Sequence, residues 1–335
     1  MITNYIADKF EAYPFIENAT GVYPLHRLNA HLQGVELYIK RDDVMDVGLG
    51  GNKLRKLEYL VQHAIEIGAD TLITSGGIQS NHARLTAIVA AKAGLHCELV
   101  LSQAVENDAA VYQHNGNILL EKLLEVPTYI VPKGSSTADF IEQRVTALKQ
   151  LGRKPYVVPM GGSSAIGCLG YVNCFLELAA QSKALGKQFS AIAVANGSAG
   201  THAGLLAGKI YSRDNTTQIV SYAVLADENT AIANTLTKTQ ATLALLDPTL
   251  GVTAADVCVN GNFLGSAYGQ PTVEMWDALK IMAKTEGIFL DPVYSGKAFA
   301  GLLADIKKGM YPVGSQILFM HTGGTPGLFA YENYL

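Results

Sequence analysis

The sequence lacks the features of proteins that bind nucleic acid or cross membranes. Only 16% of its 335 residues are charged, its 25 lysines and arginines are outnumbered by 29 aspartates and glutamates, and no basic cluster exceeds a few residues. Nucleic acid is therefore not expected as a partner, because phosphate binding needs a basic surface. No stretch reaches the ~18 apolar residues that span a bilayer, and the N-terminal MITNYIADKFEAYPF has no basic region followed by an apolar one. We expect a soluble cytoplasmic protein that makes no membrane contact.

Cysteine is also scarce, and its positions predict no metal site. Cys97, Cys168, Cys174 and Cys258 are scattered, without CxxC or Cys/His ligand spacing. We interpret them as reduced core thiols, and we expect neither a disulfide framework nor a structural zinc ion. No internal repeat, low-complexity tract or Pro/Gly linker marks a domain boundary. At 335 residues and 49% hydrophobic composition, the chain nevertheless suits two well-buried lobes, which we expect to be interleaved in sequence.

Apolar strands and amphipathic helices alternate along most of the chain. The strand VELYIKRDD at 35–43 has Val35, Leu37 and Ile39 alternating with polar residues. The later segments are a helix at 53–67, a strand at 71–75, a helix at 81–93, a strand at 96–102, a helix at 109–124, a strand at 128–131, a helix at 137–151, a strand at 155–158, a helix at 172–186 and a strand at 189–196. Such alternation predicts parallel βαβ units, and hence an α/β protein.

The stretch GGNKLRK at 50–56 places a lysine at the mouth of one of these helices. Two glycines permit a tight turn, Asn52 is well suited to cap the helix, and Lys53 then lies at the first helical position. The apolar residues that follow are spaced near i, i+3, i+4 and support the helix: Leu54, Leu57, Leu60, Val61, Ala64 and Ile65. A lysine at this position can point into a cleft.

Two further glycine-rich turns also connect a strand to a helix. The first lies in TLITSGGIQSNHAR at 71–84, and the second is NGSAGTHAG at 196–204. The second presents backbone N–H groups and hydroxyls at the positive end of a helix dipole, which is typical of a phosphate site. It is neither a Walker A loop nor a GxGxxG turn, so ATP and NAD are disfavoured. Together the three turns suggest pyridoxal phosphate, with Lys53 forming the Schiff base and Asn81 bonding the ring hydroxyl.

Six motifs resemble one family in the same order and over essentially the whole chain. They are LYIKRDD, GGNKLRKLEYL, SGGIQSNHAR, NGSAGTHAGL, FLDPVYSGKAFAGL and HTGGTPGLFAY. The family is that of the D-cysteine desulfhydrases and 1-aminocyclopropane-1-carboxylate (ACC) deaminases. The resemblance implies a tryptophan-synthase-β-like, fold type II enzyme, usually a homodimer, with an open twisted parallel sheet in each of two domains and the cofactor between them. The large cofactor-binding domain would comprise 1–52 and 166–335, and the small domain 53–165.

The resemblance also implies a role for each matching residue. Residues with catalytic roles would be Lys53, Ser80, Tyr268 and Tyr294, with Lys53 also transferring the proton at the substrate α-carbon. The cofactor would contact Lys53, Lys56, Asn81, Gly197, Ser198, Ala199, Gly200, Thr201 and Thr322. In this set Lys56 and 197–201 would lie at the phosphate, and Thr322 at the pyridine nitrogen. The substrate would contact Gln79, Ser80, Asn81, His82, Tyr268 and Tyr294. The first four of these would surround its carboxylate at a helix start, where negative charge is favoured.

Two positions separate the branches of the family. Deaminases that open a cyclopropane ring resemble DPVYEGK followed by HLGG, whereas this chain has Ser295 after the tyrosine and Thr322 in place of the leucine. Both differences favour a carbon–sulfur lyase that converts D-cysteine to pyruvate, hydrogen sulfide and ammonia by α,β-elimination. Alternatives are ACC deaminase, a lyase for another β-substituted amino acid such as cysteate, or an idle binding protein that keeps the cofactor fold.

Several of these residues also have purely structural interpretations. A lysine is usually a surface residue, and buried tyrosines commonly satisfy a backbone carbonyl. An alternative for His82 is that it merely caps a helix or packs in the core, and His202 is expected to pack in the core. The neighbouring Asp42 and Asp43 are interpreted as a charge-balanced strand end beside Lys40 and Arg41. Arg84 needs no catalytic role.

Overall fold

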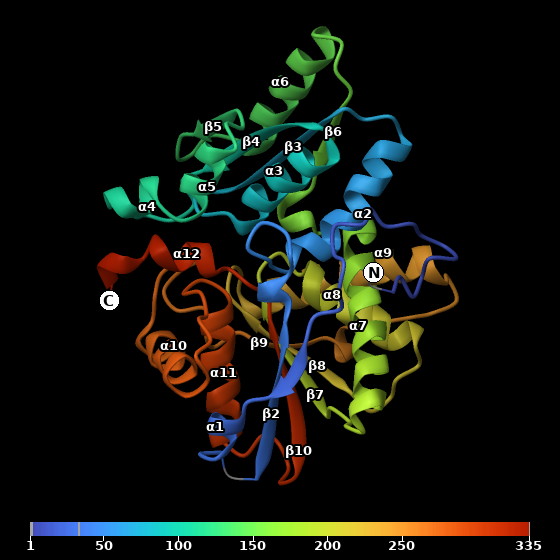
Figure 1. The fold of residues 1–335 in the computed structure, drawn as a ribbon, viewed down its shortest axis with the longest axis vertical. Helices are drawn as coiled ribbons and strands as arrows, with labels where there is room; N and C mark the ends of the chain where they lie inside the picture. Colours follow the sequence, from blue (N-terminus) through green and yellow to red (C-terminus); the bar gives the residue numbers. More distant parts are fainter. Residues whose placement is uncertain (1–2, 33, 335) are drawn as a thin grey trace.

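The computed structural model describes residues 3–32 and 34–334, and in it the strands form two sheets (Figure 1). The larger sheet has the order β1-β2-β10-β7-β8-β9 and is parallel apart from the β1/β2 pair. Its strands are β1 (Val22–Pro24), β2 (Val35–Arg41), β7 (Ala191–Asn196), β8 (Gln218–Ala223), β9 (Cys258–Asn260) and β10 (Ser315–His321). The strand predicted at 35–43 therefore ends at Arg41, and a 3₁₀ turn follows at Asp42–Val44.

The smaller sheet has four parallel strands in the order β5-β4-β3-β6. They are β3 (Thr71–Gly77), β4 (His96–Ser102), β5 (Thr128–Val131) and β6 (Pro155–Val158). This sheet lies above the larger one in Figure 1 and consists of a continuous part of the chain. The two parallel sheets confirm the predicted α/β fold class.

Helices cover both faces of both sheets. The helices are α1 (His26–Asn29), α2 (Lys53–Glu66), α3 (Asn81–Ala93), α4 (Ala110–His114), α5 (Asn117–Leu123), α6 (Thr137–Gln150), α7 (Ala165–Leu185), α8 (Gly200–Tyr211), α9 (Glu228–Leu246), α10 (Val273–Glu286), α11 (Ser295–Lys307) and α12 (Thr325–Phe329). On the larger sheet, Ile317 and Phe319 of β10 pack with α10 and α11, while Leu318 and Met320 pack with α7 and α8. Because both faces are buried, these strands are apolar at nearly every position.

The helix predicted at 109–124 is wrong as a single element. The chain forms α4 and α5, and between them Asn115 is extended and Gly116 has a φ of 64°. The carbonyl oxygens of Tyr112 and Asn115 accept hydrogen bonds from Gln79 instead of continuing a helix. The glycine is needed here because a Cβ at 116 would lie 2.6 Å from Gln79 Oε1, in a left-handed conformation that other residues disfavour. A tertiary contact therefore overrides the local helix pattern.

The carboxyl ends of four parallel strands meet at one pocket between the two sheets. The turns after β2, β3, β7 and β10 lead into α2, α3, α8 and α12, and residues from all four turns line a common pocket. Carboxyl ends of parallel strands are the usual position of a ligand site in open α/β folds. None of the described helices has the length and apolar character to cross a membrane.

Candidate active site

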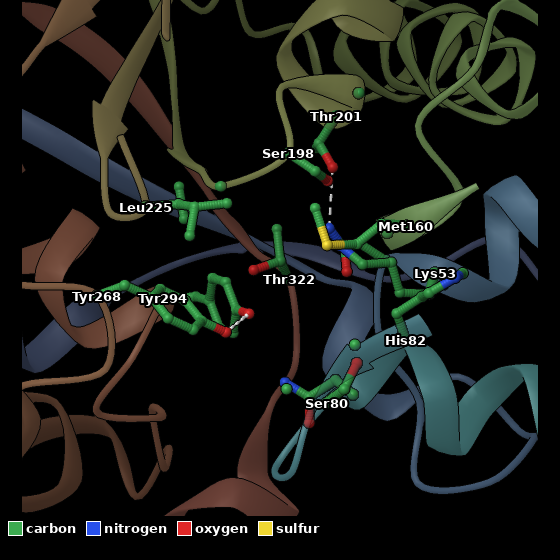
Figure 2. Close-up of a pocket in the computed structure, with 18 of the residues that line it drawn as sticks. Lys53, Ser80, His82, Met160, Ser198, Thr201, Leu225, Tyr268, Tyr294 and Thr322 are labelled. Carbon is green, nitrogen blue, oxygen red and sulfur yellow. Dashed lines mark hydrogen bonds between the residues drawn. The ribbon is translucent and has the colours of Figure 1, made fainter. Parts of the chain in front are cut away.

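The pocket between the sheets collects most of the predicted site residues (Figure 2). It is lined by Lys53, Ser80, Asn81, His82, Gly197, Ser198, Ala199, Gly200, Thr201, Tyr268, Tyr294 and Thr322. Asn52, Met160 and Leu225, to which the sequence analysis assigned no role in the site, also contribute to its wall. Segments far apart in the sequence thus form one chemically mixed cavity.

Lys53 is the first residue of α2 and faces this pocket. Burial, reinforced by the nearby positive charge of Lys56, holds its pKa well below the ordinary value of 10.5, although Asp291 acts in the opposite direction. A neutral amine is the form that attacks a carbonyl or accepts a proton. The sequence predicted that Asn52 caps α2, but its side chain makes no capping hydrogen bond. Its Nδ2 donates to Thr201 Oγ1 at 2.9 Å, which ties the starts of α2 and α8 together.

The turn from β7 to α8 forms a cradle for an anion. In the described part of the chain, the N–H groups of Gly197, Ser198 and Ala199 have no hydrogen-bond acceptor. The first N–H groups of α8 are likewise unused within the helix and add its positive dipole end. A Cβ at Gly200 would lie 2.4 Å from Ser163 Oγ and 2.8 Å from Lys56 Nζ, so only glycine fits between the cradle and the residues behind it. These donors match a phosphate group.

Lys56 lies behind this cradle and does not form the pocket wall. Its Nζ donates to Gly161 O at 3.2 Å and to Ser163 Oγ at 3.1 Å, and Ser163 is hydrogen-bonded to Ser198 at 2.7 Å. Burial lowers the pKa of Lys56 to about 8. A positive charge therefore lies beneath the loop that would hold a phosphate, linked to it through Ser163. Sequence reasoning missed Ser163, although it follows the two glycines of the MGGSS run.

The start of α3 supplies Ser80, Asn81 and His82. Ser80 caps the helix, accepting from Ala83 N at 3.1 Å, while its hydroxyl proton stays available to the pocket. The imidazole of His82 is 2.9 Å from Thr74 Oγ1, and Thr74 donates to Val158 O. Burial, together with the nearby lysines, keeps the pKa of His82 well below 6.5, so the ring is neutral. Its side chain therefore packs beneath the helix start instead of reaching out as a cation.

Gln79 was predicted to contact the substrate, but it is not among the residues that line the pocket. Its Nε2 donates to Tyr112 O at 2.6 Å and to Asn115 O at 2.9 Å, and its Oε1 accepts from Asn117 N at 2.9 Å. All of these partners belong to the α4–α5 turn. The side chain is thus committed to holding that turn against the loop that carries Ser80 and Asn81.

Tyr268 and Tyr294 form a pair whose hydroxyls are hydrogen-bonded to each other (Figure 2). Their ring centroids are 6.0 Å apart. Burial raises the pKa of Tyr268, and burial together with the proximity of Tyr268 raises that of Tyr294 well above 10. Both phenols are therefore protonated at neutral pH. Because one proton is used within the pair, the other hydroxyl can still donate to a third group.

Asp291 holds the turn that presents Tyr294. Its carboxylate accepts from Val293 N at 2.9 Å, from Tyr294 N at 2.8 Å, and from Ser295 N and Oγ at 2.7 and 2.6 Å. Ser295 is buried by these bonds, whereas Thr322 faces the pocket, and the carbonyl of Thr322 accepts from Asn52 N at 3.0 Å. Of the two positions that distinguish the family branches, Thr322 is the one that lines the cavity.

The remaining charged candidates have structural roles, as expected. Asp43 is paired with the neighbouring Arg41 at 2.7 Å, whereas Asp42 is paired with Arg55 at 2.9 Å and accepts from the Tyr171 hydroxyl at 2.6 Å. His202 is buried against Ser221. Within residues 3–32 and 34–334, no cluster of three His, Cys, Asp or Glu side chains could hold a metal ion, and the four cysteines are free thiols.

A lysine amine and an anion cradle that face one pocket between two sheets fit a pyridoxal-phosphate enzyme, the class of protein that the sequence motifs resemble. Comparison with known proteins agrees: residues 16–323 match the family model described as "Pyridoxal-phosphate dependent enzyme". Curated D-cysteine desulfhydrases of Yersinia pestis (strain Pestoides F) and Serratia proteamaculans (strain 568) are 45% and 42% identical, each alignment covering 97% of both chains. The chain therefore belongs to the pyridoxal-phosphate-dependent enzyme family, in the group of the D-cysteine desulfhydrases and ACC deaminase homologues.

Solved structures give the same placement. A crystal structure of an ACC deaminase homologue superposes with a TM-score of 0.88 at 36% identity, covering 98% of this chain and 96% of the other. A pyridoxal 5'-phosphate-dependent aspartate racemase superposes with a TM-score of 0.65 at 14% identity, covering 92% of this chain and 90% of the other, and shows the shared fold alone. The predicted fold type and cofactor class are confirmed.

Proposed function

We propose that this protein is a pyridoxal-phosphate-dependent carbon–sulfur lyase that converts D-cysteine and water to pyruvate, ammonia and hydrogen sulfide. The observation that carries the proposal is the content of one pocket: Lys53 with a lowered pKa, an anion cradle backed by Lys56, and a pair of protonated tyrosines. The curated names of the relatives, at 42–45% identity, support D-cysteine as the substrate.

Each wall of the pocket has a part in this proposal. When bound, the cofactor supplies an electron sink for the α-carbon of the substrate. Lys53, whose burial favours the neutral amine by lowering its pKa, accepts the α-proton. The N–H groups and the Ser80 hydroxyl at the start of α3 bind the substrate carboxylate, which the helix dipole favours there. The free hydroxyl of the Tyr268–Tyr294 pair donates a proton toward the leaving sulfur.

Two residues would set the electronic character of the cofactor ring. Thr322 reaches the pyridine nitrogen in this proposal, and a hydroxyl there leaves the nitrogen less firmly protonated than a carboxylate would. Asn81, which also lines the pocket, would contact the ring oxygen. The 197–201 cradle, with Lys56 behind it, would hold the phosphate of the cofactor and so restrain its ring.

ACC deaminase is the second candidate because the solved structure with a TM-score of 0.88 is that of an ACC deaminase homologue. The pocket argues for the lyase at position 322, where a polar threonine stands in place of the leucine typical of the deaminase branch. At 295, the buried serine bonds Asp291, and a glutamate there would bring two carboxylates together. Both substitutions favour elimination over ring opening.

We also propose the assembly and domain division that the family resemblance implies. The protein would act as a cytoplasmic homodimer on a small amino-acid substrate. The small domain would comprise 53–165 and the large cofactor-binding domain 1–52 and 166–335. The division is supported by the position of the four-stranded sheet, whose strands all lie between 71 and 158.

The proposal is tested by assaying the purified, cofactor-loaded protein with D-cysteine, L-cysteine, D-cysteate, L-cysteate and ACC in parallel. Pyruvate should form from D-cysteine and disappear in Lys53→Ala. Lys92→Ala, at an exposed position near the end of α3, is the matched control and should retain activity. Formation of 2-oxobutyrate from ACC would instead establish the deaminase, and cofactor binding without turnover of any of the five would contradict the lyase assignment.

A further inference from the structure

Asn117, at the start of α5, connects the loop of Gln79 and Asn81 to the buried Arg84. It is fully buried, and its backbone N–H donates to Gln79 Oε1 at 2.9 Å. Its side-chain Nδ2 donates to Gln79 O at 3.1 Å and to Asn81 Oδ1 at 2.9 Å. Its Oδ1 accepts from Arg84 Nε at 2.7 Å. Every polar atom of the Asn117 side chain is therefore engaged, although it does not line the pocket.

Only one assignment of donors and acceptors is possible along the hydrogen bonds from Arg84 through Asn117 to Asn81. Arg84 has only N–H donors, and its guanidinium, with a pKa lowered by burial to about 10, is still protonated at neutral pH. The atom of Asn117 that faces Arg84 must accept, so it is the oxygen, and the nitrogen must face Asn81. The atom of Asn81 that meets this nitrogen must accept in turn. The amino group of Asn81 is thereby directed away from Asn117.

Arg84 is itself anchored to the turn that precedes the lysine of the site. It donates to the carbonyl of Gly48 and reaches the carbonyl of Gly50 at 3.5 Å. Gly116 allows α5 to approach closely enough for the whole arrangement, as its missing side chain leaves room for Gln79. Arg84, which is held in place by the 48–50 turn, thus sets which atom of the Asn81 amide faces the pocket.

We propose that Asn117 is a positioning residue: held by Arg84, it fixes Asn81 so that the Asn81 amino group donates to an oxygen anion in the pocket. This inference rests on the proposed function, in which that anion is the ring oxygen of pyridoxal phosphate. An amide turned the other way would present its carbonyl oxygen and repel the anion. A buried residue outside the pocket would therefore determine whether Asn81 attracts or repels the cofactor ring.

Asn117→Asp is the sharpest test because aspartate has almost the same shape. The new carboxylate still accepts from Arg84, whose charge balances it, but it can no longer donate to Asn81 Oδ1 or to Gln79 O. The Asn81 amide should then turn over to donate to the carboxylate. Asn115→Asp is the matched control: it adds the same charge two residues away, and its one side-chain bond, accepted from Gly116 N at 2.8 Å, is also available to aspartate.

For Asn117→Asp we expect pyridoxal phosphate to bind roughly tenfold to hundredfold more weakly, as for loss of a hydrogen bond to a charged group. The visible band of the bound cofactor should also lose intensity to the near-ultraviolet form, in which the ring oxygen is protonated. Asn115→Asp should match the wild type in affinity and spectrum. A purely structural role of Asn117 would lower the melting temperature and leave the spectrum of the bound cofactor unchanged.

The outcomes separate this inference from the proposed function. Wild-type turnover of D-cysteine with an unchanged cofactor spectrum and affinity in Asn117→Asp would overturn the role of Asn117 alone. Failure of the wild type to bind the cofactor would overturn both. If Asn117→Asp does not fold, neutron diffraction of the wild-type holoenzyme decides the matter. Deuterons of Asn81 Nδ2 directed at the cofactor support the inference, and deuterons directed at Asn117 refute it.

Discussion

Replacing Glu121 by glutamine should make the protein more stable at alkaline pH. Glu121 lies on α5, is 2% exposed, and both of its carboxylate oxygens lack a hydrogen-bond partner among the described residues. Burial raises its pKa from 4.5 to about 8, and attraction to Arg84 opposes this only in part. The folded protein therefore keeps this group protonated at pH 7, whereas the unfolded chain ionises it.

The sign and size of the effect follow from proton linkage. Below pH 4.5 both states hold the proton, and Glu121 does not make stability depend on pH. As the pH rises from 4.5 to about 8, the unfolded state alone gives up the proton, which lowers the free energy of unfolding by about 1.4 kcal/mol per pH unit. The total loss reaches about 5 kcal/mol once the pH exceeds 8. Glutamine cannot ionise, so the free energy of unfolding of Glu121→Gln should not fall with pH in this way.

Urea unfolding of wild type and Glu121→Gln at pH 5, 6.5 and 8 measures this difference directly. Most of the advantage of the variant should emerge between pH 5 and pH 8, where it should gain about 4 kcal/mol relative to the wild type. Glu142→Gln, which makes the same change at an exposed position on α6, should show no such trend. Parallel pH dependence of Glu121→Gln and wild type would show that the Glu121 carboxyl is hydrated or paired, and would refute the reasoning.

Two further changes test the anion cradle and its support, and a third tests a buried charge network elsewhere in the fold. Lys56→Met should weaken pyridoxal phosphate binding about tenfold or more, because it removes the charge behind the cradle; equal affinity in a fluorescence titration would contradict this, and Lys92→Met is the control. Gly200→Ala should fold yet lose cofactor affinity, since its Cβ would lie 2.4 Å from Ser163 Oγ; normal cofactor absorbance in this variant would refute the cradle. Glu177→Gln should lower the free energy of unfolding by about 3 to 5 kcal/mol, because it breaks the buried pairs with Lys40 and Arg55. A loss below ~1 kcal/mol in urea would show that these charges are not coupled as their geometry suggests.

Most of the fold was predictable because its signals are local. Apolar strands followed by glycine turns and amphipathic helices indicated the parallel sheets, and the helix that begins at Lys53 was located to the residue. The turn at 197–201 was recognised by its glycines and hydroxyls, and the structure places it at the start of α8. The helix at 109–124 failed because its break serves a contact with Gln79, far away in the sequence.

Most of the predicted site residues line one pocket, but the direction of each side chain could not be predicted. The sequence predicted the same role, contact with the substrate, for four consecutive residues: Gln79, Ser80, Asn81 and His82. In the structure, however, the amide of Gln79 holds the α4–α5 turn, Ser80 caps α3, and the ring of His82 packs on Thr74. The direction of each side chain depends on neighbours that no motif contains.

The sequence by itself determined the class of fold, the residue that begins α2 and the turn that can hold a phosphate. It could do so because backbone conformation and hydrophobic period are encoded within a few neighbouring residues. Only the tertiary structure decided that Lys56 is hydrogen-bonded to Ser163, 107 residues away, and that Arg84 is linked to Asn81 through Asn117. Hydrogen bonds of this kind depend on how helices that are distant in sequence are placed relative to one another in the folded protein. The spacing of residues along the chain does not specify that placement.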